Sequence, residues 1–375
     1  MLVILLLCLW IQDAPSASGM GGGKLQALPQ TGKALQIGIS GHPLSAAAYN
    51  ANASTIQGVS YDTQIGMLKE MGMRVYRMDV YTNAAGRSRN HDLFLSMLTK
   101  CREQGITVLP MIYDRCRYEG SPEEAYREGF AQMAGFASLY GAYLTYFELG
   151  NEMELFDKLR KGGDGQWERN YDMQRVSVAA KYIKGMEEGL KSVMPEAQSM
   201  VNTAGFFPLF WMDTMFAEAP SINICAWHVY PEMPPLYLSR YGIGNIHEFL
   251  YSRYQRPIWY TETNSRARKE LTPEENEARS SRWTRTFREA CMADPNVEAV
   301  IYHELLDNPE RGGLASRNFE EEHFGFVKFN GYPGKEDPVA YRAWVSRPDR
   351  YQDWSYRMAA RDLIETRKRV SENRN

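Results

Sequence analysis

YFELGNE, from Tyr146 to Glu152, is an apolar and aromatic run that ends abruptly in Gly-Asn-Glu. Such a run predicts a buried β-strand that carries an amide and a carboxylic acid at its C-terminal tip. A second run of this kind, PIWYTETN from Pro257 to Asn264, places Glu262 110 positions after Glu152 (262 minus 152). We therefore interpret the rest of the chain as the scaffold that brings these two acids together.

Short apolar runs alternate with longer amphipathic ones from residue 34 onward, which is typical of βα units around a parallel sheet. The runs predicted to be strands are 34–40, 74–80, 107–113, 145–150, 198–203, 222–230, 257–262 and 297–303. Helices are expected at 63–72, 91–105, 122–139, 172–194 and 273–292. SPEE from Ser121 and TPEE from Thr272 each place a hydroxyl cap, a proline and two acids at a helix start. Gly72 and Gly105 suit left-handed C-caps.

Eight strands that are each followed by a helix predict an α/β fold, a closed (β/α)8 TIM barrel. An open doubly wound sheet is the alternative, but GISGH, from Gly38 to His42, does not complete its glycine-rich phosphate turn. We expect a single catalytic domain over residues 34–346, whose last helix covers 337–345. Residues 347–375 are expected to form a C-terminal helical extension and tail.

The N-terminus starts with ten residues, MLVILLLCLW, that lead into the small-residue run 14–19. The apolar run is too short to span a bilayer and has the length of a signal-peptide core, although no Lys or Arg precedes it. We expect residues 1–19 to be a signal peptide and 20–33 a flexible lead-in. Export to the periplasm or the medium follows, and no stable membrane span is expected.

Composition excludes some classes of function. The formal charge of -3 argues against non-specific nucleic-acid binding. Aromatic residues make up 12% of the chain; sugar-binding clefts use such rings as flat platforms, although packing between strands and helices explains most of them. The cysteines after the leader match no zinc pattern, and we expect buried free thiols and no metal or organic cofactor. These cysteines are Cys101, Cys116, Cys225 and Cys291.

Ligands of such a barrel meet the C-terminal ends of the strands, where Glu152 and Glu262 fall on strands four and seven. Two carboxylates are what hydrolysis of a glycosidic bond requires. A separation of roughly 5 Å allows one to attack the anomeric carbon while the other protonates the leaving oxygen, whereas about 6.5 to 9.5 Å leaves room for an inverting water.

Asn-Glu ending strand four, with a lone Glu ending strand seven, resembles clan A of the glycoside hydrolases, which share this barrel and a retaining mechanism. The resemblance implies that Glu152 is the acid/base and Glu262 the nucleophile. It implies that Asn151 binds the sugar 2-hydroxyl and that Arg77, on strand two, supports the nucleophile. His228 and Tyr230 resemble the strand-six aromatic pair beside it.

Within the clan, GISGH from Gly38 and YHELLDNP from Tyr302 look most like glycoside hydrolase family 39 and the Psl-type bacterial endoglycosidases encoded with exopolysaccharide synthesis. Two features depart from that pattern. Met153 replaces the proline common after Asn-Glu, and no β-sandwich follows the barrel in this sequence.

Other interpretations of these residues stay open. Glu152 could cap a helix, Glu262 could form a structural salt bridge with Arg77, and His228 could be a buried core histidine. Glu148 shares strand parity with Glu152 and is interpreted as a buried partner for Arg77 or a histidine. Four further residues at or just beyond strand tips are expected to contact substrate: His42, Tyr113, Asp114 and Trp211. Glu304 and Asp307 either bind sugar hydroxyls or solvate their loop.

The sequence thus predicts an exported retaining β-glycosidase that acts, in endo mode, on a polysaccharide such as an exopolysaccharide. A monomer is expected, with a polysaccharide-synthesis complex as a conceivable partner. Two alternatives come from other classes: a carbohydrate-binding barrel without turnover, and a transglycosylase or scaffold in a polymer-synthesis complex.

Overall fold

The computed structural model describes residues 34–44, 55–56, 59–155, 159, 161–205, 208–231, 241–309 and 319–372. The expected signal peptide and lead-in, 1–33, lie outside these residues. The described residues from 34 to 372 form one compact unit.

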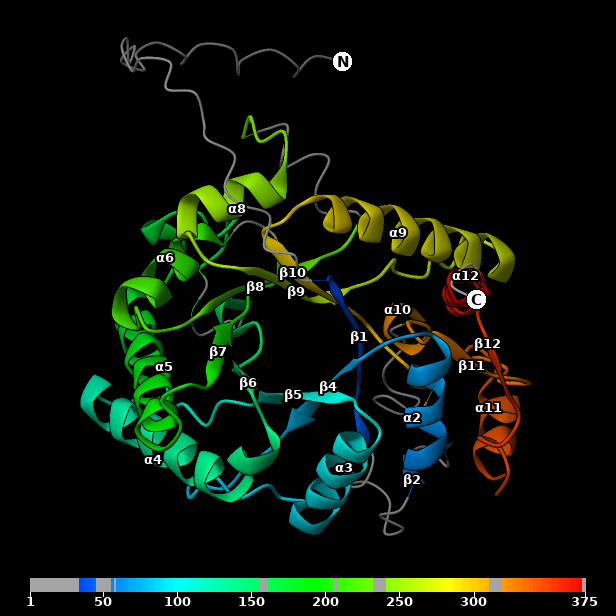
Figure 1. Cartoon of the computed structure of the whole chain (residues 1–375), viewed down its shortest axis with the longest axis horizontal. Helices are drawn as coiled ribbons and strands as arrows, with labels where there is room; N and C mark the ends of the chain where they lie inside the picture. Colours follow the sequence, from blue (N-terminus) through cyan, green and yellow to red (C-terminus); the bar gives the residue numbers. More distant parts are fainter. Residues whose placement is uncertain are drawn as a thin grey trace, which may run out of the picture. The chain divides into compact units, whose positions relative to one another are not determined.

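Eight parallel strands close into a barrel, which confirms the predicted TIM-barrel fold (Figure 1). Around the barrel the order is β1-β10-β9-β8-β7-β6-β5-β4, so β1 pairs with both β4 and β10. The strands are β1 (Gln36–Gly41), β4 (Val75–Val80), β5 (Thr107–Ile112), β6 (Tyr146–Leu149), β7 (Gln198–Val201), β8 (Ile224–Val229), β9 (Ile258–Thr263) and β10 (Val297–Tyr302). Each predicted strand is present within a few residues of its expected bounds.

Helices follow the strands and surround them (Figure 1). The long ones are α2 (Tyr61–Glu70), α3 (His91–Glu103), α4 (Pro122–Tyr140), α5 (Met173–Val193), α6 (Leu209–Glu218), α8 (Ile246–Tyr254) and α9 (Pro273–Ala293). Ser121 and Thr272 form the capping boxes that start α4 and α9, as their sequences predict. Gly72 and Gly105 have φ of 75° and 68°, which confirms the left-handed turns after α2 and α3.

The barrel interior holds an apolar cluster of its own, separate from the core between strands and helices. Its buried members are Val75, Leu109, Met200, Ile224, Ala226, Trp259, Ala299 and Ile301. We call this cluster the floor. It lies below the C-terminal strand ends and makes the barrel a packed core with its ligand face at one end.

Strand β9 contains one residue more than its neighbours near its C-terminal end. Ala226 of β8 pairs with Trp259 of β9, and His228 pairs with Glu262. An advance of two residues along β8 therefore corresponds to an advance of three along β9. On the other side, Val300 and Tyr302 of β10 pair with Tyr260 and Thr263, again two steps against three. Such a bulge shifts the alternation of side chains between the two faces of a strand. It turns Glu262 toward the interior, the face on which Trp259 also lies.

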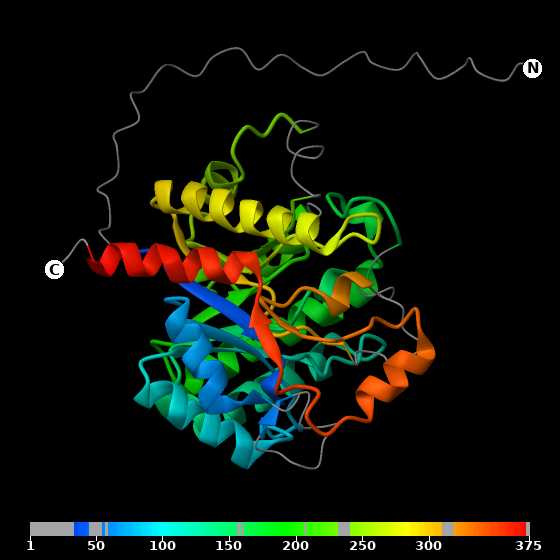
Figure 2. The same cartoon turned by 90° about the vertical axis from the view of Figure 1, so that its right-hand side faces the viewer.

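The C-terminal segment packs against the barrel's outer layer. Helix α12 (Met358–Glu372) runs alongside α9 (Figure 2), and Ser281 of α9 donates a hydrogen bond to Asp362. It follows α10 (Phe319–Glu322) and α11 (Pro338–Val345). The extension is not purely helical as expected, because β12 (Trp354–Tyr356) pairs antiparallel with β11 (Val327–Phe329). Alternating aromatic residues in such a short run favour a strand over a helix.

Cys101, Cys225 and Cys291 are buried free thiols and Cys116 is a half-buried one, in agreement with the sequence. Among the described helices, none combines the length and apolarity that crossing a membrane requires.

Candidate active site

Glu152 lies just past the end of β6, in a tightly turned segment. Gly150 has φ 81°, and a side chain there would place its Cβ 2.6 Å from the sulfur of Met153. Glu152 itself has φ 44°, a left-handed conformation that is uncommon for a residue with a side chain. Its backbone N–H donates to Oδ1 of Asn202, at the tip of β7, over 2.7 Å. The neighbouring strand thus holds Glu152 in this conformation.

A buried acid, Glu154, anchors the same turn from below. Its Oε1 accepts hydrogen bonds from Oγ1 of Thr203 at 2.7 Å and from the N–H of Ala204 at 2.6 Å. Burial and the charge of Glu152 raise the pKa of Glu154 to about 7. The carboxyl that supports Glu152 therefore changes its charge near neutral pH.

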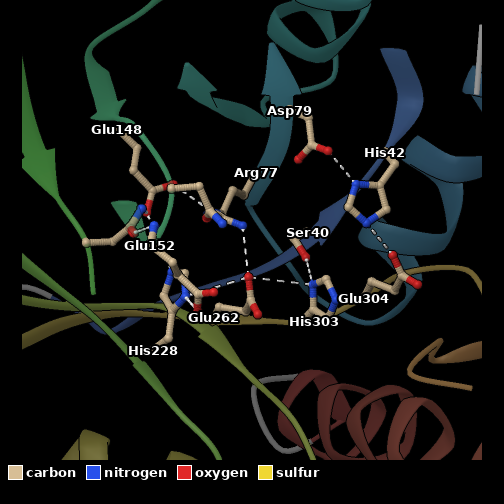
Figure 3. Close-up of polar contacts among 12 residues, drawn as sticks. Ser40, His42, Arg77, Asp79, Glu148, Glu152, His228, Glu262, His303 and Glu304 are labelled. Atoms are coloured by element: carbon tan, nitrogen blue, oxygen red, sulfur yellow. Dashed lines mark hydrogen bonds and ion pairs between the residues drawn. The ribbon is translucent and has the colours of Figure 1, made fainter. Parts of the chain in front are cut away.

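Arg77, on β4, connects three of the predicted residues (Figure 3). Its Nε lies 2.6 Å from Oε2 of Glu148, its Nη2 donates to Oδ1 of Asn151 at 2.8 Å, and its Nη1 lies 3.4 Å from Oε2 of Glu262. Glu148 is thus the buried partner of Arg77 that the sequence predicted. Because Arg77 is only 3% exposed, its positive charge acts on these side chains and not on solvent.

His228, on β8, lies between the two predicted catalytic acids. Its Nδ1 is 2.7 Å from Oε1 of Glu152 and 3.8 Å from Oε2 of Glu262. Burial alone would lower the pKa of His228, but Glu262, Glu148 and Glu152 together raise it to about 10. The imidazole is therefore positively charged at neutral pH and links the two carboxylates.

Glu262 is held as an ionised carboxylate. Burial alone would raise its pKa, but His303, His228 and Arg77, together with a hydrogen bond, hold the pKa of Glu262 well below its usual range. The hydrogen bond comes from the hydroxyl of Tyr230, which donates to Oε1.

The two acids are close neighbours despite their separation in sequence. One carboxylate oxygen of Glu152, one ring nitrogen of His228 and one carboxylate oxygen of Glu262 all lie within 4.8 Å of one another. Figure 3 shows their side chains converging from three different strands. The arrangement brings together an ionised carboxylate, a second carboxyl group and a cationic imidazole at the barrel's rim.

A second polar group lies on the other side of Glu262, and sequence reasoning identified only part of it (Figure 3). His42, at the end of β1, contacts Asp79 of β4 at 2.6 Å and Glu304 at 2.7 Å. His303 follows β10, and its Nδ1 lies 2.9 Å from Oγ of Ser40. Asp79 was missed, although it has the strand parity of Arg77 and stands at a strand end.

The other predicted contact residues lie in different surroundings. Tyr113 stacks on Tyr81, with ring centroids 4.2 Å apart. Asp114 accepts local hydrogen bonds from the N–H of Cys116 and the hydroxyl of Tyr118, as in a turn. Trp211 is 0% exposed in α6 and belongs to the hydrophobic core, so it offers no surface to a substrate. Asp307, beyond β10, pairs with Arg357 at 2.6 Å.

No protein-family model matches the sequence, and no curated protein is similar to it. Solved structures are similar in fold. A β-glycosidase is matched with a TM-score of 0.56 at 14% identity over 83% of this chain and 86% of that one. A fungal β-1,4-galactanase is matched with a TM-score of 0.53 at 13% identity, over 78% of this chain and 95% of that one. The GH53 catalytic domain of Ignisphaera aggregans is matched with a TM-score of 0.52 at 17% identity, over 84% of this chain and 97% of that one.

A β-glucuronidase from Bacteroides uniformis is also similar, with a TM-score of 0.53 at 14% identity. This match covers 78% of the present chain but 33% of the glucuronidase, so the chain spans about a third of that enzyme. The chain shares its barrel with glycoside hydrolases. At these identities the likeness shows the fold, and the family 39 assignment stays a prediction.

Proposed function

We propose that this protein is a retaining β-glycosidase in which Glu262 is the nucleophile and Glu152 the acid/base. The proposal depends mainly on one observation, the approach of these two carboxylates to within 4.8 Å at the barrel's rim. Retaining glycosidases have carboxyl groups about 5 to 5.5 Å apart, and a larger gap accompanies inversion. The glycosidases that share the fold agree with this choice.

The charges around the two acids suit different roles. In the first step, an oxygen of Glu262 forms a bond to the anomeric carbon while Glu152 gives its proton to the departing sugar oxygen. In the second, water attacks the same carbon, Glu152 takes the water proton, and Glu262 leaves as a carboxylate. Arg77 and Tyr230 stabilise the carboxylate at the start and the end. The charge of His228, 2.7 Å from Glu152, stabilises the carboxylate that Glu152 becomes between the two steps.

The substrate we propose is a polysaccharide, cleaved internally, with an exported exopolysaccharide as the first candidate. The apolar N-terminal leader and the resemblance to family 39 and Psl-type enzymes support this choice. A panel of polysaccharides, with product sizes recorded, tests it: oligosaccharides of mixed length indicate endo action, whereas monosaccharides alone contradict it.

The catalytic roles are tested with aryl β-glycosides that differ in leaving group. Because only a poor leaving group needs the proton, Glu152→Ala should slow such substrates by about 10²- to 10⁴-fold and change activated ones far less. Equal loss on both kinds of substrate contradicts the role of Glu152. Proton NMR of the first-formed product should show the β anomer, and an α product would establish inversion instead.

A further inference from the structure

The polar group beyond Glu262 has the composition of a metal site, and only His303 of it comes near the proposed nucleophile, with Nδ1 3.9 Å from Oε2 of Glu262. We call it the histidine cluster: His42, His303 and Glu304, with Asp79 and Ser40 behind them. Its members come from the ends of β1, β4 and β10 (Figure 3). One ligand atom each from His42, His303 and Glu304 lie within 4.8 Å of one another.

The contact between His42 and Glu304 is a short ion pair with poor hydrogen-bond geometry. Nε2 of His42 and Oε2 of Glu304 are 2.7 Å apart, yet Nε2 has no hydrogen-bond partner of suitable geometry among the described residues. Oε1 of Glu304 also lacks a partner there, although Glu304 is only 1% exposed. Buried polar atoms without hydrogen bonds are costly. A cation held between His42, His303 and Glu304 would satisfy them.

The opposite nitrogen of each imidazole is anchored. Nδ1 of His42 lies 2.6 Å from Oδ2 of Asp79, and Nδ1 of His303 lies 2.9 Å from Oγ of Ser40. Metal-binding histidines are almost always oriented in this way, through a hydrogen bond from the ring nitrogen that does not bind the ion. The anchors leave Nε2 of both rings for a ligand.

Charge and access agree with a cation. The cluster brings two carboxylates, Asp79 and Glu304, to opposite sides of the His42 ring. Two imidazoles and a carboxylate are a common ligand set for zinc, with metal–nitrogen and metal–oxygen distances of about 2.0 to 2.2 Å. To reach these metal–ligand distances, Nε2 of His42 and Oε2 of Glu304 must move apart by less than about 1 Å. The side chain of His42 is 22% exposed, which gives an ion a route from solvent.

We propose that His42, His303 and Glu304 bind one divalent transition-metal ion of the zinc type, with Asp79 and Ser40 as orienting partners. The group Glu152, His228 and Glu262 is equally compact, but Arg77 already places a fixed positive charge 3.4 Å from Glu262. That charge disfavours a metal between the catalytic acids. The proposal does not depend on the proposed hydrolysis.

Titration of the chelator-treated full chain with ZnCl2, followed by calorimetry, tests the proposal. We expect one zinc ion per chain and, with CoCl2, visible absorption from nitrogen and oxygen ligands. His42→Ala should weaken zinc binding by at least about 100-fold, because a ligand is lost. Asp79→Asn keeps all three ligands and should weaken it by about 10- to 100-fold. Circular dichroism before titration shows that each variant is folded.

Two matched variants locate the ion. Glu152→Gln alters the competing group, and His91→Ala removes a histidine of α3 that contacts Tyr140; both should bind zinc with wild-type affinity. The proposal is wrong if the wild-type chain binds no zinc at millimolar concentration, or if His42→Ala binds as tightly as the wild type. A loss in Glu152→Gln as large as that in His42→Ala also overturns it. Equal affinity for Ca²⁺ and Zn²⁺ would exclude imidazole coordination.

Discussion

The floor and the rim of this barrel are built by the same strands but have opposite character. Val75 of the floor is two residues before Arg77 of the rim, and Ala226 is two before His228. The floor is apolar and tightly buried, whereas the rim carries ionised groups and buried atoms without a hydrogen bond, such as Oε1 of Glu304. Stability is therefore concentrated in one layer, and the next layer can hold charges that folding alone would disfavour.

The largest expected effect separates chemistry from stability at the rim. Glu262→Gln removes the proposed nucleophile without changing its volume and should lower kcat/KM by about 10⁴-fold or more. The chain should stay folded, because the floor is untouched. Glu289→Gln, the same change on the exposed side of α9, is the control and should leave kcat/KM unchanged. Substantial residual activity, measured after purification from a host without such activity, would exclude Glu262 as nucleophile.

The opposite result, a loss of stability with little change in activity, is expected for a substitution in the floor. Trp259→Ala empties the space of a fully buried indole and should lower the free energy of unfolding by about 3 to 5 kcal/mol, measured by urea denaturation. The activity of the fraction that remains folded should change little. Trp167→Ala, at a side chain 54% exposed, should change the unfolding free energy by less than about 0.5 kcal/mol. Similar losses in both variants would contradict the division into layers.

A smaller effect measures how much stability the fold loses when a buried acid near the rim, Glu154, ionises. Because the pKa of Glu154 is raised to about 7, the folded chain keeps a proton that the unfolded chain loses near its ordinary pKa of 4.5. Stability from this group is complete below pH 4.5 and is lost as the pH rises through about 7, by at most roughly 3 kcal/mol. The side chain at position 154 does not titrate in Glu154→Gln. The free energy of unfolding of this variant should therefore rise by that amount relative to wild type between pH 4 and pH 8. Urea denaturation across this range checks it; parallel pH curves for the two proteins would contradict it.

The eight strands were predictable because each is an apolar run bounded by turn residues, and helix starts such as Ser121 and Thr272 carry complete capping sequences. The rule that side chains at the C-terminal ends of barrel strands meet also predicted the contacts of Arg77 with Glu148 and Glu262. Contacts between residues from different strands of the barrel were harder to predict. Asp79, His303 and Ser40 come from three strands, and no spacing along the chain relates them.

Two differences have local causes. Trp211 was expected at the rim because it follows a strand, but it lies in the first turns of α6, whose apolar face turns it into the core. The histidine cluster was identified only in part, because its imidazoles and carboxylate are brought together only by the closed barrel. Long-range convergence of single residues leaves no periodic signal in a sequence.

The extra residue in β9 has a consequence for reading related sequences. Strict in–out alternation counted from Trp259 would assign Thr261 or Thr263 to the ligand face and send Glu262 toward the helices. Loss of a single codon in this strand could therefore inactivate the protein while every acidic residue remained in its sequence. At this point of the chain, length specifies the chemistry as strictly as residue identity does.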